Sequence, residues 1–286
     1  MTMVILAQGR DRRQFIRDSF KRLAGRIPSG PILVKPKVDP VEGYPASTHP
    51  EVLDEILTLL SGRDVTVADG WDDPPFRTPA PGAAHPLARV CQKHGLELKN
   101  LHLLPSVGHR AGSEEIRLAD AVLSAACIVS LPVFHCIPAG KLSGALNNWH
   151  GLLAPEQPGR LVSGRGQSHR VLALLARMLP PALVFADATE VLLQPNAFVQ
   201  DRQALTVGVM LAGESPAAID SFMLRRLRDA LPGFRIGDET SFPPLRAARD
   251  QGILPRAYQL EWLGEPPPKP LPHRPASPTA GWRLSL

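Results

Sequence analysis

The stretch that decides the fold is residues 32–68, ILVKPKVDPVEGYPASTHPEVLDEILTLLSGRDVTVA. Its two ends, residues 32–34 and 65–68, are short apolar runs without polar alternation, which is typical of strands buried on both faces. Between them lies an apolar stripe at helical spacing, formed by Val52, Ile56, Leu59 and Leu60. Thr48 and Glu51 have the spacing of a capping box, with Thr48 as the N-cap. A strand, a helix and a strand in this order predict a parallel sheet.

The rest of the chain continues this pattern. Further apolar runs predict strands at residues 4–7, 127–131, 182–186 and 206–211. Helical spacing predicts helices at residues 11–23, 87–94, 169–178 and 217–227. We also expect a strand at residues 101–104 and a flexible polar segment at 105–113. The predicted class is α/β, a mostly parallel sheet with helices on both faces.

Length and composition set the limits of this domain. The chain has 286 residues, 44% of them hydrophobic, which is enough for a sizeable core. We expect one α/β domain over residues 1–263, and the sequence leaves open whether it forms two closely packed lobes with a crevice between them. Residues 264–286 form a tail in which seven of the thirteen residues 266–278 are proline. Such a segment favours disorder and could dock on a protein partner.

Charge and cysteine content exclude several classes. The formal charge of +5 is spread over the chain and only 5% of residues are aromatic, so we expect a small acidic molecule rather than nucleic acid as the partner. The three cysteines, Cys91, Cys127 and Cys136, cannot form a disulfide framework, which favours a reducing, cytoplasmic setting. The N-terminal apolar run is too short for a signal peptide, and no later run predicts contact with a membrane.

Residues 128–151 carry most of the polar chemistry. The strand at 127–131 is followed by a predicted loop with His135, Cys136 and Lys141, and then by a short helix that ends in Asn147, Asn148, Trp149 and His150. Two other predicted strands end in charged residues, which are Lys35 and Lys37 after residues 32–34 and Asp187 and Glu190 after residues 182–186. Because ligands bind at the carboxyl ends of such strands, we expect these side chains to line one crevice.

Two kinds of chemistry remain open for this crevice. In the first, Lys35, Lys37 and Lys141 bind an anion, Asn147 and Asn148 hydrogen-bond the substrate, and His135, Cys136 and Asp187 are the catalytic residues. In the second, His135, Cys136, His150 and Glu190 hold a transition metal. The opposing interpretation is that His150 caps a helix and Cys136 is a small buried apolar residue. The spacings of a P-loop and of a dinucleotide-binding loop are both absent.

Several segments resemble one protein family. The segments are residues 32–37 (ILVKPK), 48–51 (THPE), 142–151 (LSGALNNWHG), 187–190 (DATE) and 211–220 (LAGESPAAID). Together they resemble the domain of unknown function 362 (DUF362), in the order in which that family has them, over roughly residues 4–255. Many members carry a ferredoxin-like module with runs of four cysteines, and this chain has no such run, so we expect no iron–sulfur cluster.

The chain also departs from the family pattern. The family's Pro-Lys-x-Lys-Thr-His segment corresponds to Pro132 followed by Val133, Phe134, His135 and Cys136, so both of its lysines are replaced. The resemblance therefore implies the place of the site more than its chemistry. Our leading hypothesis is an enzyme that acts on a small anionic metabolite by histidine-centred acid–base or metal-assisted chemistry. The alternatives are a non-catalytic metal-binding or maturation factor and an interaction protein that docks through its tail.

Overall fold

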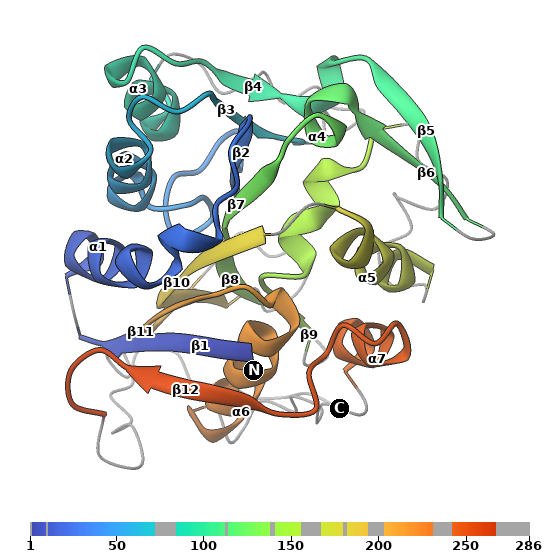
Figure 1. The fold of residues 1–286 in the computed structure, drawn as a ribbon. Helices are drawn as coiled ribbons and strands as arrows, with labels where there is room; N and C mark the ends of the chain where they lie inside the picture. Colours follow the sequence, from blue (N-terminus) through green and yellow to red (C-terminus); the bar gives the residue numbers. More distant parts are fainter. Residues whose placement is uncertain are drawn as a thin grey trace.

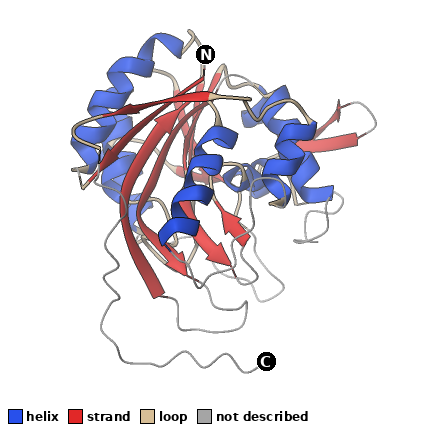
Figure 2. Ribbon diagram, turned by 90° about the horizontal axis from the view of Figure 1, so that it is seen from below, coloured by secondary structure: helices blue, strands red, loops and turns tan. Residues whose placement is uncertain are grey.

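The computed structural model describes residues 2–9, 11–71, 84–111, 114–137, 141–155, 167–179, 182–193, 203–230 and 242–266. In these ranges the chain forms one ten-stranded sheet with helices packed on both of its faces (Figures 1 and 2). The strands of this sheet are β1 (Thr2–Gln8), β2 (Ile32–Pro36), β3 (Val65–Asp69), β4 (Leu98–Asn100), β7 (Cys127–Leu131), β8 (Val133–Ile137), β9 (Lys141–Ser143), β10 (Ala182–Leu193), β11 (Gln203–Gly213) and β12 (Tyr258–Trp262).

The sheet is mostly parallel. Its strand order is β12-β1-β11-β10-β7-β2-β3-β4, and β8 and β9 extend it beside β10. Only β11, between β1 and β10, and β9, beside β8, run antiparallel to their neighbours in the described part of the sheet. The predicted class, an α/β fold with a mostly parallel sheet and helices on both faces, is therefore confirmed.

The helices form a layer on each face of the sheet. The α-helices are α1 (Arg12–Leu23), α2 (Pro50–Leu59), α3 (Pro86–Lys93), α4 (Asp120–Leu123), α5 (Gln167–Met178), α6 (Pro216–Ala230) and α7 (Pro243–Asp250). Short 3₁₀ helices are η1 (Ala24–Arg26), η2 (Leu101–Leu103) and η3 (Asn147–Leu152). A separate antiparallel hairpin, β5 (Ser106–Ala111) and β6 (Glu114–Ala119), projects beside α4 in Figure 1.

Strand β1 shows how the sheet separates two apolar layers. Because successive side chains of a strand point to opposite faces, Ile5 and Ala7 pack with Phe15 of α1, whereas Val4 and Leu6 pack towards α6. The layer on the Ile5 face also contains α2 and α3, and the opposite face contains α5, α6, α7 and η3. Each fully buried Ile, Leu or Phe contributes about 1.5–3 kcal/mol relative to an exposed one, so these layers dominate the stability of the domain.

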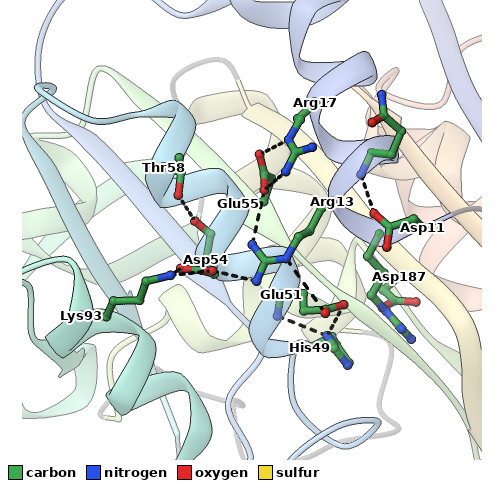
Figure 3. Close-up of polar contacts among 12 residues, drawn as sticks. Asp11, Arg13, Arg17, His49, Glu51, Asp54, Glu55, Thr58, Lys93 and Asp187 are labelled. Atoms are coloured by element: carbon green, nitrogen blue, oxygen red, sulfur yellow. Dashed lines mark hydrogen bonds and ion pairs between the residues drawn. The ribbon is translucent and has the colours of Figure 1, made fainter.

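A network of ion pairs fixes the helices on the Ile5 face against one another (Figure 3). Asp54 of α2 is 6% exposed, and three side chains donate to it: Arg13 at 2.8 Å, Lys93 at 2.7 Å and His94 at 2.8 Å. Burial alone would raise the pKa of Asp54, but these donors outweigh it and lower the pKa well below its usual range. The network connects α1, α2 and the end of α3, and it fixes the amino ends of α1 and α2 relative to each other.

Three local predictions were wrong. Residues 101–104 do not form a strand: residues 101–103 form η2, because the Asn100 side chain accepts a hydrogen bond from the backbone N–H of His102 and starts a turn. Residues 106–111 form β5 rather than a flexible segment, since they pair with β6. The N-cap of α2 is His49, because the Thr48 hydroxyl instead donates to the Leu131 carbonyl at 2.5 Å.

Two expectations concern other parts of the chain. The proline-rich tail lies, from residue 267 onward, outside the described residues. Among the described helices, none is both long and apolar enough to cross a bilayer.

Candidate functional site

The carboxyl ends of the parallel strands carry two polar clusters, one on each face of the sheet. The Lys35 cluster consists of Lys35, Asp69, Ser130 and Asn148, and the Asp187 cluster consists of Arg12, Tyr44, His49 and Asp187. The members of each come from separate elements of the fold. This is the edge at which α/β sheets bind ligands, and at which the sequence predicted a site.

The Lys35 cluster is buried and satisfied by its own members. The Lys35 ammonium is 1% exposed and donates to Asp69 Oδ1 at 2.5 Å and to Asn148 Oδ1 at 3.3 Å. The Asn148 amide in turn donates to the Ser130 hydroxyl at 2.9 Å. Burial lowers the pKa of Lys35, and Asp69 opposes this effect. Enclosure of this kind is typical of a group that holds strands together rather than one that meets a ligand.

Asp69 extends this cluster to the loop after β2. Its Oδ2 accepts the backbone N–H of Val38 at 2.8 Å, and its Oδ1 accepts that of Gly70 at 2.8 Å. A Cβ on Gly151 would lie 2.1 Å from Asp69 Oδ1, so only glycine fits where η3 passes over this carboxylate. The buried pair of Lys35 and Asp69 therefore fixes the backbone of the loop after β2 and the position of η3 at this edge of the sheet.

The Asp187 cluster reaches the surface. Asp187 is 1% exposed, and its Oδ2 accepts from Arg12 Nε at 2.7 Å. Its Oδ1 accepts from the Tyr44 hydroxyl at 3.3 Å and from the Thr189 backbone N–H at 2.8 Å. Arg12 is 19% exposed, and its guanidinium lies 4.9 Å from the centre of the Tyr44 ring. The partly exposed Arg12 guanidinium is thus held in place by the buried Asp187 carboxylate.

The charge states in this cluster follow from burial and from Asp187. Burial opposes the charge on Arg12, but the hydrogen bond to Asp187 outweighs it and raises the pKa of Arg12. Burial, assisted by Asp187, raises the pKa of Tyr44, so its hydroxyl stays protonated. This state agrees with the geometry, in which Tyr44 donates to Asp187 and accepts the Glu190 backbone N–H at 2.8 Å.

His49 completes the cluster as a neutral imidazole. Its ring packs edge-on against Tyr44 with centroids 4.9 Å apart, and its Nδ1 accepts the Glu51 backbone N–H at 3.2 Å. Nδ1 also lies 3.8 Å from the Glu51 carboxylate, a distance that an ion pair would allow. Burial, followed by the charge of Arg12, lowers the pKa of His49 despite Asp187, which favours the neutral imidazole. With Nδ1 accepting, the proton is on Nε2, which is then a donor.

The segment 142–151 is fixed by a carboxylate from α6. Asp220 is 2% exposed and accepts the backbone N–H groups of Ala145 at 2.6 Å and Leu146 at 2.9 Å. A Cβ on Gly144 would lie 2.3 Å from Asp220 Oδ1, so glycine is required there. Burial raises the pKa of Asp220 to about 7, although both N–H groups lower it. Asp220 therefore places η3, and with it Asn148, over the end of β2.

His135 and Cys136 lie on a strand, which corrects the predicted loop. With Val133 and Phe134 they form β8, which pairs with the second half of β10. Cys136 is 1% exposed within the apolar layer towards α6, and burial raises the pKa of its thiol to about 12. His135 is half-buried, with Nε2 3.3 Å from the Pro45 carbonyl oxygen. This environment gives no support to a Cys136 thiolate.

The predicted strand end at Asp187 is also corrected. β10 continues to Leu193, so Asp187 lies within the strand. Its backbone N–H donates to the Pro132 carbonyl at 3.0 Å, at the point where β7 ends and β8 begins beside β10. The side chain consequently still lies level with the carboxyl ends of the neighbouring strands.

The other predicted site residues are dispersed. Lys37 is half-buried with its Nζ 3.2 Å from the Val38 carbonyl, and Asn147 donates to the Ser143 hydroxyl at 2.7 Å. Lys141 begins β9, and its side chain lies outside the described part of the chain. His150 and Glu190 are half-buried on η3 and β10. Among the described residues, no three His, Cys, Asp or Glu side chains are grouped so that they could hold a metal ion.

Sequence reasoning missed several residues of these clusters. Asp69 and Arg12 each follow a predicted strand directly or within a few residues, so the strand-end argument that selected Lys35 could have included them. Asp220 lies in a segment that the family resemblance had already singled out. Tyr44 had no signal, because only the folded loop after β2 brings it to Asp187.

Comparisons with known proteins give one family match. The model described as "Domain of unknown function (DUF362)" matches residues 32–225. Among solved structures, the chain is similar to a crystal structure of a Thermotoga maritima protein from a structural genomics consortium, with 12% identity and a TM-score of 0.37. That alignment covers 71% of this chain and 55% of the other, so this chain spans about half the length of that protein. A comparison with curated proteins finds no match.

Proposed function

The protein belongs to the DUF362 family, and we propose that it is an enzyme that acts on a small anionic metabolite at the carboxyl edge of its sheet, with the Asp187 cluster as the centre of the site. The observation that carries this proposal is the pairing of a partly exposed cation, Arg12, with a partly exposed neutral imidazole, His49, above one buried carboxylate. A fixed cation can bind an anionic group, and a nearby hydrogen-bond donor can stabilise the charge that develops on it during a reaction.

Arg12 is the anion-binding group. Its Nε donates to Asp187, which orients the planar guanidinium, and the arginine side chain is 19% exposed. A carboxylate or phosphate is the natural partner of a guanidinium fixed in one orientation, because both can accept two parallel hydrogen bonds. Lys37, half-buried on the loop after β2, adds positive charge at the same edge.

His49 is the acid–base group. A neutral imidazole that accepts a helix N–H at Nδ1 presents Nε2–H as a donor, and it can polarise a carbonyl or give a proton to a developing oxyanion. Histidine-centred chemistry was expected from the sequence at His135, and we propose His49 for that role because it is beside Arg12 and Asp187. Tyr44 packs against the imidazole and positions it.

The proposal also includes a cellular location and a partner. We propose a cytoplasmic enzyme, which is supported by three cysteines that are all free and buried. We propose a small anionic molecule as its partner. We propose no metal in the mechanism, since acid–base chemistry by His49 does not require one.

Ligand binding by thermal unfolding tests this proposal. The protein is heated with a panel of phosphate, malate, oxaloacetate and succinate, together with Arg12→Gln and a matched control, Arg17→Gln, on the same helix. Arg17 also pairs with a buried carboxylate, Glu55, at 2.7 Å. A ligand at one hundred times its Kd stabilises the folded state by about 2.7 kcal/mol.

We expect at least one anion to raise the unfolding midpoint of the wild type and of Arg17→Gln but not of Arg12→Gln. Once an anion is found, turnover of it by His49→Gln should fall with little change in binding. Wild-type turnover should be flat through neutral pH and fall only below the ordinary histidine pKa of about 6.5, since folding lowers the pKa of His49. Equal stabilisation of Arg12→Gln, or no response to any of the anions, would overturn the proposal.

A further inference from the structure

A concave surface lies between α6 and the edge strand β12, on the face of the sheet opposite to Arg12 and Asp187. Its cavity has a volume of about 660 Å³ and is lined by α6, by residues 254–257 and by β12. We refer to it as the β12 groove. Its volume lies within the range of about 300–1,000 Å³ that is common for small-molecule sites. None of the residues that the sequence suggested for a site lies among the described residues that line it.

One wall of the groove is formed by side chains of β12. Tyr258, Leu260 and Trp262 occupy alternate positions of β12 and therefore share one face of the strand. Tyr258 and Trp262 pack at their inner sides on the apolar layer beneath α6, and Leu260 is 45% exposed. In the described sheet, β12 pairs only with β1, so this wall is at the end of the sheet. Aromatic rings held in this way provide a surface on which a planar ring can stack.

The other wall is cationic. Arg225, Arg226 and Arg256 line the groove, and Asp229 is the one acidic residue among the described lining residues. Arg225 lies 5.4 Å from the centre of the Tyr258 ring and donates to its hydroxyl, so this arginine also braces the aromatic wall. The three arginines exceed the single carboxylate, and the groove therefore favours an anion.

Arg226 adds a specific reason for an anion at this place. Its Nη2 donates to the Gln8 side-chain oxygen at 3.2 Å, and its Nε is buried without a hydrogen-bond partner in the described part of the chain. Burial lowers the pKa of Arg226, and Asp229 opposes this only in part. A bound carboxylate or phosphate would restore the stabilisation that burial removes.

We propose that the β12 groove binds a small aromatic anion, with its ring against Tyr258 and Trp262 and its carboxylate or phosphate held by Arg256 and Arg226. The groove can contact both parts of this ligand from one concave surface, and its described lining residues include no member of the Asp187 cluster. The site is therefore separate from the proposed active site, and its existence does not depend on that proposal.

Isothermal titration calorimetry with two probes and their matched controls tests the ligand class. The probes are 2-naphthoate, an aromatic carboxylate, and AMP, an aromatic phosphate. The controls are 2-naphthol and adenosine, which keep the ring and lack the anion, and inorganic phosphate, which lacks the ring. We expect at least one probe to bind about tenfold more tightly than its controls, because 2-naphthol and adenosine lose the hydrogen bonds to the anion and inorganic phosphate loses the stacked ring. The probe that binds identifies carboxylate or phosphate as the preferred anion, and the proposal is overturned if neither binds.

Variants locate the bound probe. Arg256→Gln, at an exposed position, and Trp262→Leu should each raise the Kd for the bound probe by about tenfold. Arg246→Gln removes an exposed cation from α7 outside the groove and should leave the Kd unchanged. Thermal unfolding of each variant shows whether it is folded. If Trp262→Leu does not fold, Arg256→Gln still tests the assignment. An unchanged Kd in Arg256→Gln, or a loss of binding in Arg12→Gln, would place the probe elsewhere and refute the assignment.

Discussion

Replacement of Lys35 by methionine is expected to be among the most destabilising single changes at the site edge. Methionine keeps an unbranched apolar side chain and removes the ammonium that is 1% exposed and 2.5 Å from Asp69 Oδ1. Loss of one partner of a buried ion pair usually costs about 3–5 kcal/mol, since the remaining charge is left uncompensated. Asp69 keeps the backbone N–H groups of Val38 and Gly70, so we expect the lower end, about 3 kcal/mol. For a domain of this size, that lowers the unfolding midpoint by about 6–12 °C.

The partner variant Asp69→Asn separates the ion pair from the rest of the cluster. Alone, it leaves the Lys35 ammonium with Asn148 and the Pro36 carbonyl, and the lysine can respond by losing its proton. Since burial already lowers the pKa of Lys35, the loss in Asp69→Asn should become smaller as the pH rises from 7 towards 10. The double variant contains no uncompensated charge, so its loss should be about 2–3 kcal/mol less than the sum of the two single losses.

Urea unfolding, followed by circular dichroism, measures the free energy of unfolding of all four proteins of this cycle. Equal slopes of that free energy against urea concentration show that the four proteins expose the same surface when they unfold. The cycle is best run at pH 7, where the charge pair is present. If the two single losses add to within about 0.5 kcal/mol, the two side chains do not interact as a buried pair and the description of the Lys35 cluster is refuted.

Four further outcomes are expected. Asp54→Asn should cost about 3 kcal/mol at pH 7, and the difference from wild type should shrink as the pH falls below about 4, because a carboxylate with a lowered pKa stabilises the fold only while it is ionised. Gly144→Ala should cost about 3 kcal/mol by steric overlap, whereas Gly25→Ala, with no atom within 4 Å of the added carbon, should change stability by less than about 0.5 kcal/mol. Asp220→Asn should flatten the decrease in unfolding free energy between pH 4 and 7, because a carboxyl whose pKa folding raises to about 7 favours the folded state only while it is protonated. Cys136 should not react with a thiol reagent at pH 8 until urea is added, since burial raises its pKa to about 12, and rapid reaction of the native protein would contradict its buried position.

The sheet was predictable because its signal is local. The apolar runs at residues 32–34, 65–68 and 127–131 lack alternation, and a strand buried on both faces requires this pattern. Strand β5 of the hairpin was missed because its sequence, SVGHRA, has neither an apolar run nor a regular alternation and contains Gly108. Strand β8 was also missed: the residues after Pro132 were predicted as a loop, and their pairing partner is the second half of β10, which the sequence did not predict as part of the strand.

The position of the candidate residues in the fold was predictable, but their surroundings were not. The rule that carboxyl ends of parallel strands carry ligand groups selected Lys35 and Asp187, and both lie at that edge. The rule could not tell that the two lie on opposite faces of the sheet, with Lys35 enclosed and Asp187 beneath an accessible arginine. That difference depends on which side chains cover each strand end, and those come from Asn148 and Tyr44, distant in sequence.

The buried contacts also explain why the family-like segments say little about the reaction. Gly144 is required by Asp220, Gly151 by Asp69, and Asn148 by Lys35, so segments from four parts of the chain fix one another through buried groups. The resemblance of these segments to the family is thus accounted for by the scaffold, whereas the family-like segments 48–51 and 187–190 contain His49 and Asp187 of the proposed site. Arg12, which carries the proposed anion site, lies before the matched residues 32–225. Members that share this scaffold can consequently differ in the exposed groups around it, and function must be established at Arg12 and its neighbours rather than inherited from the motifs.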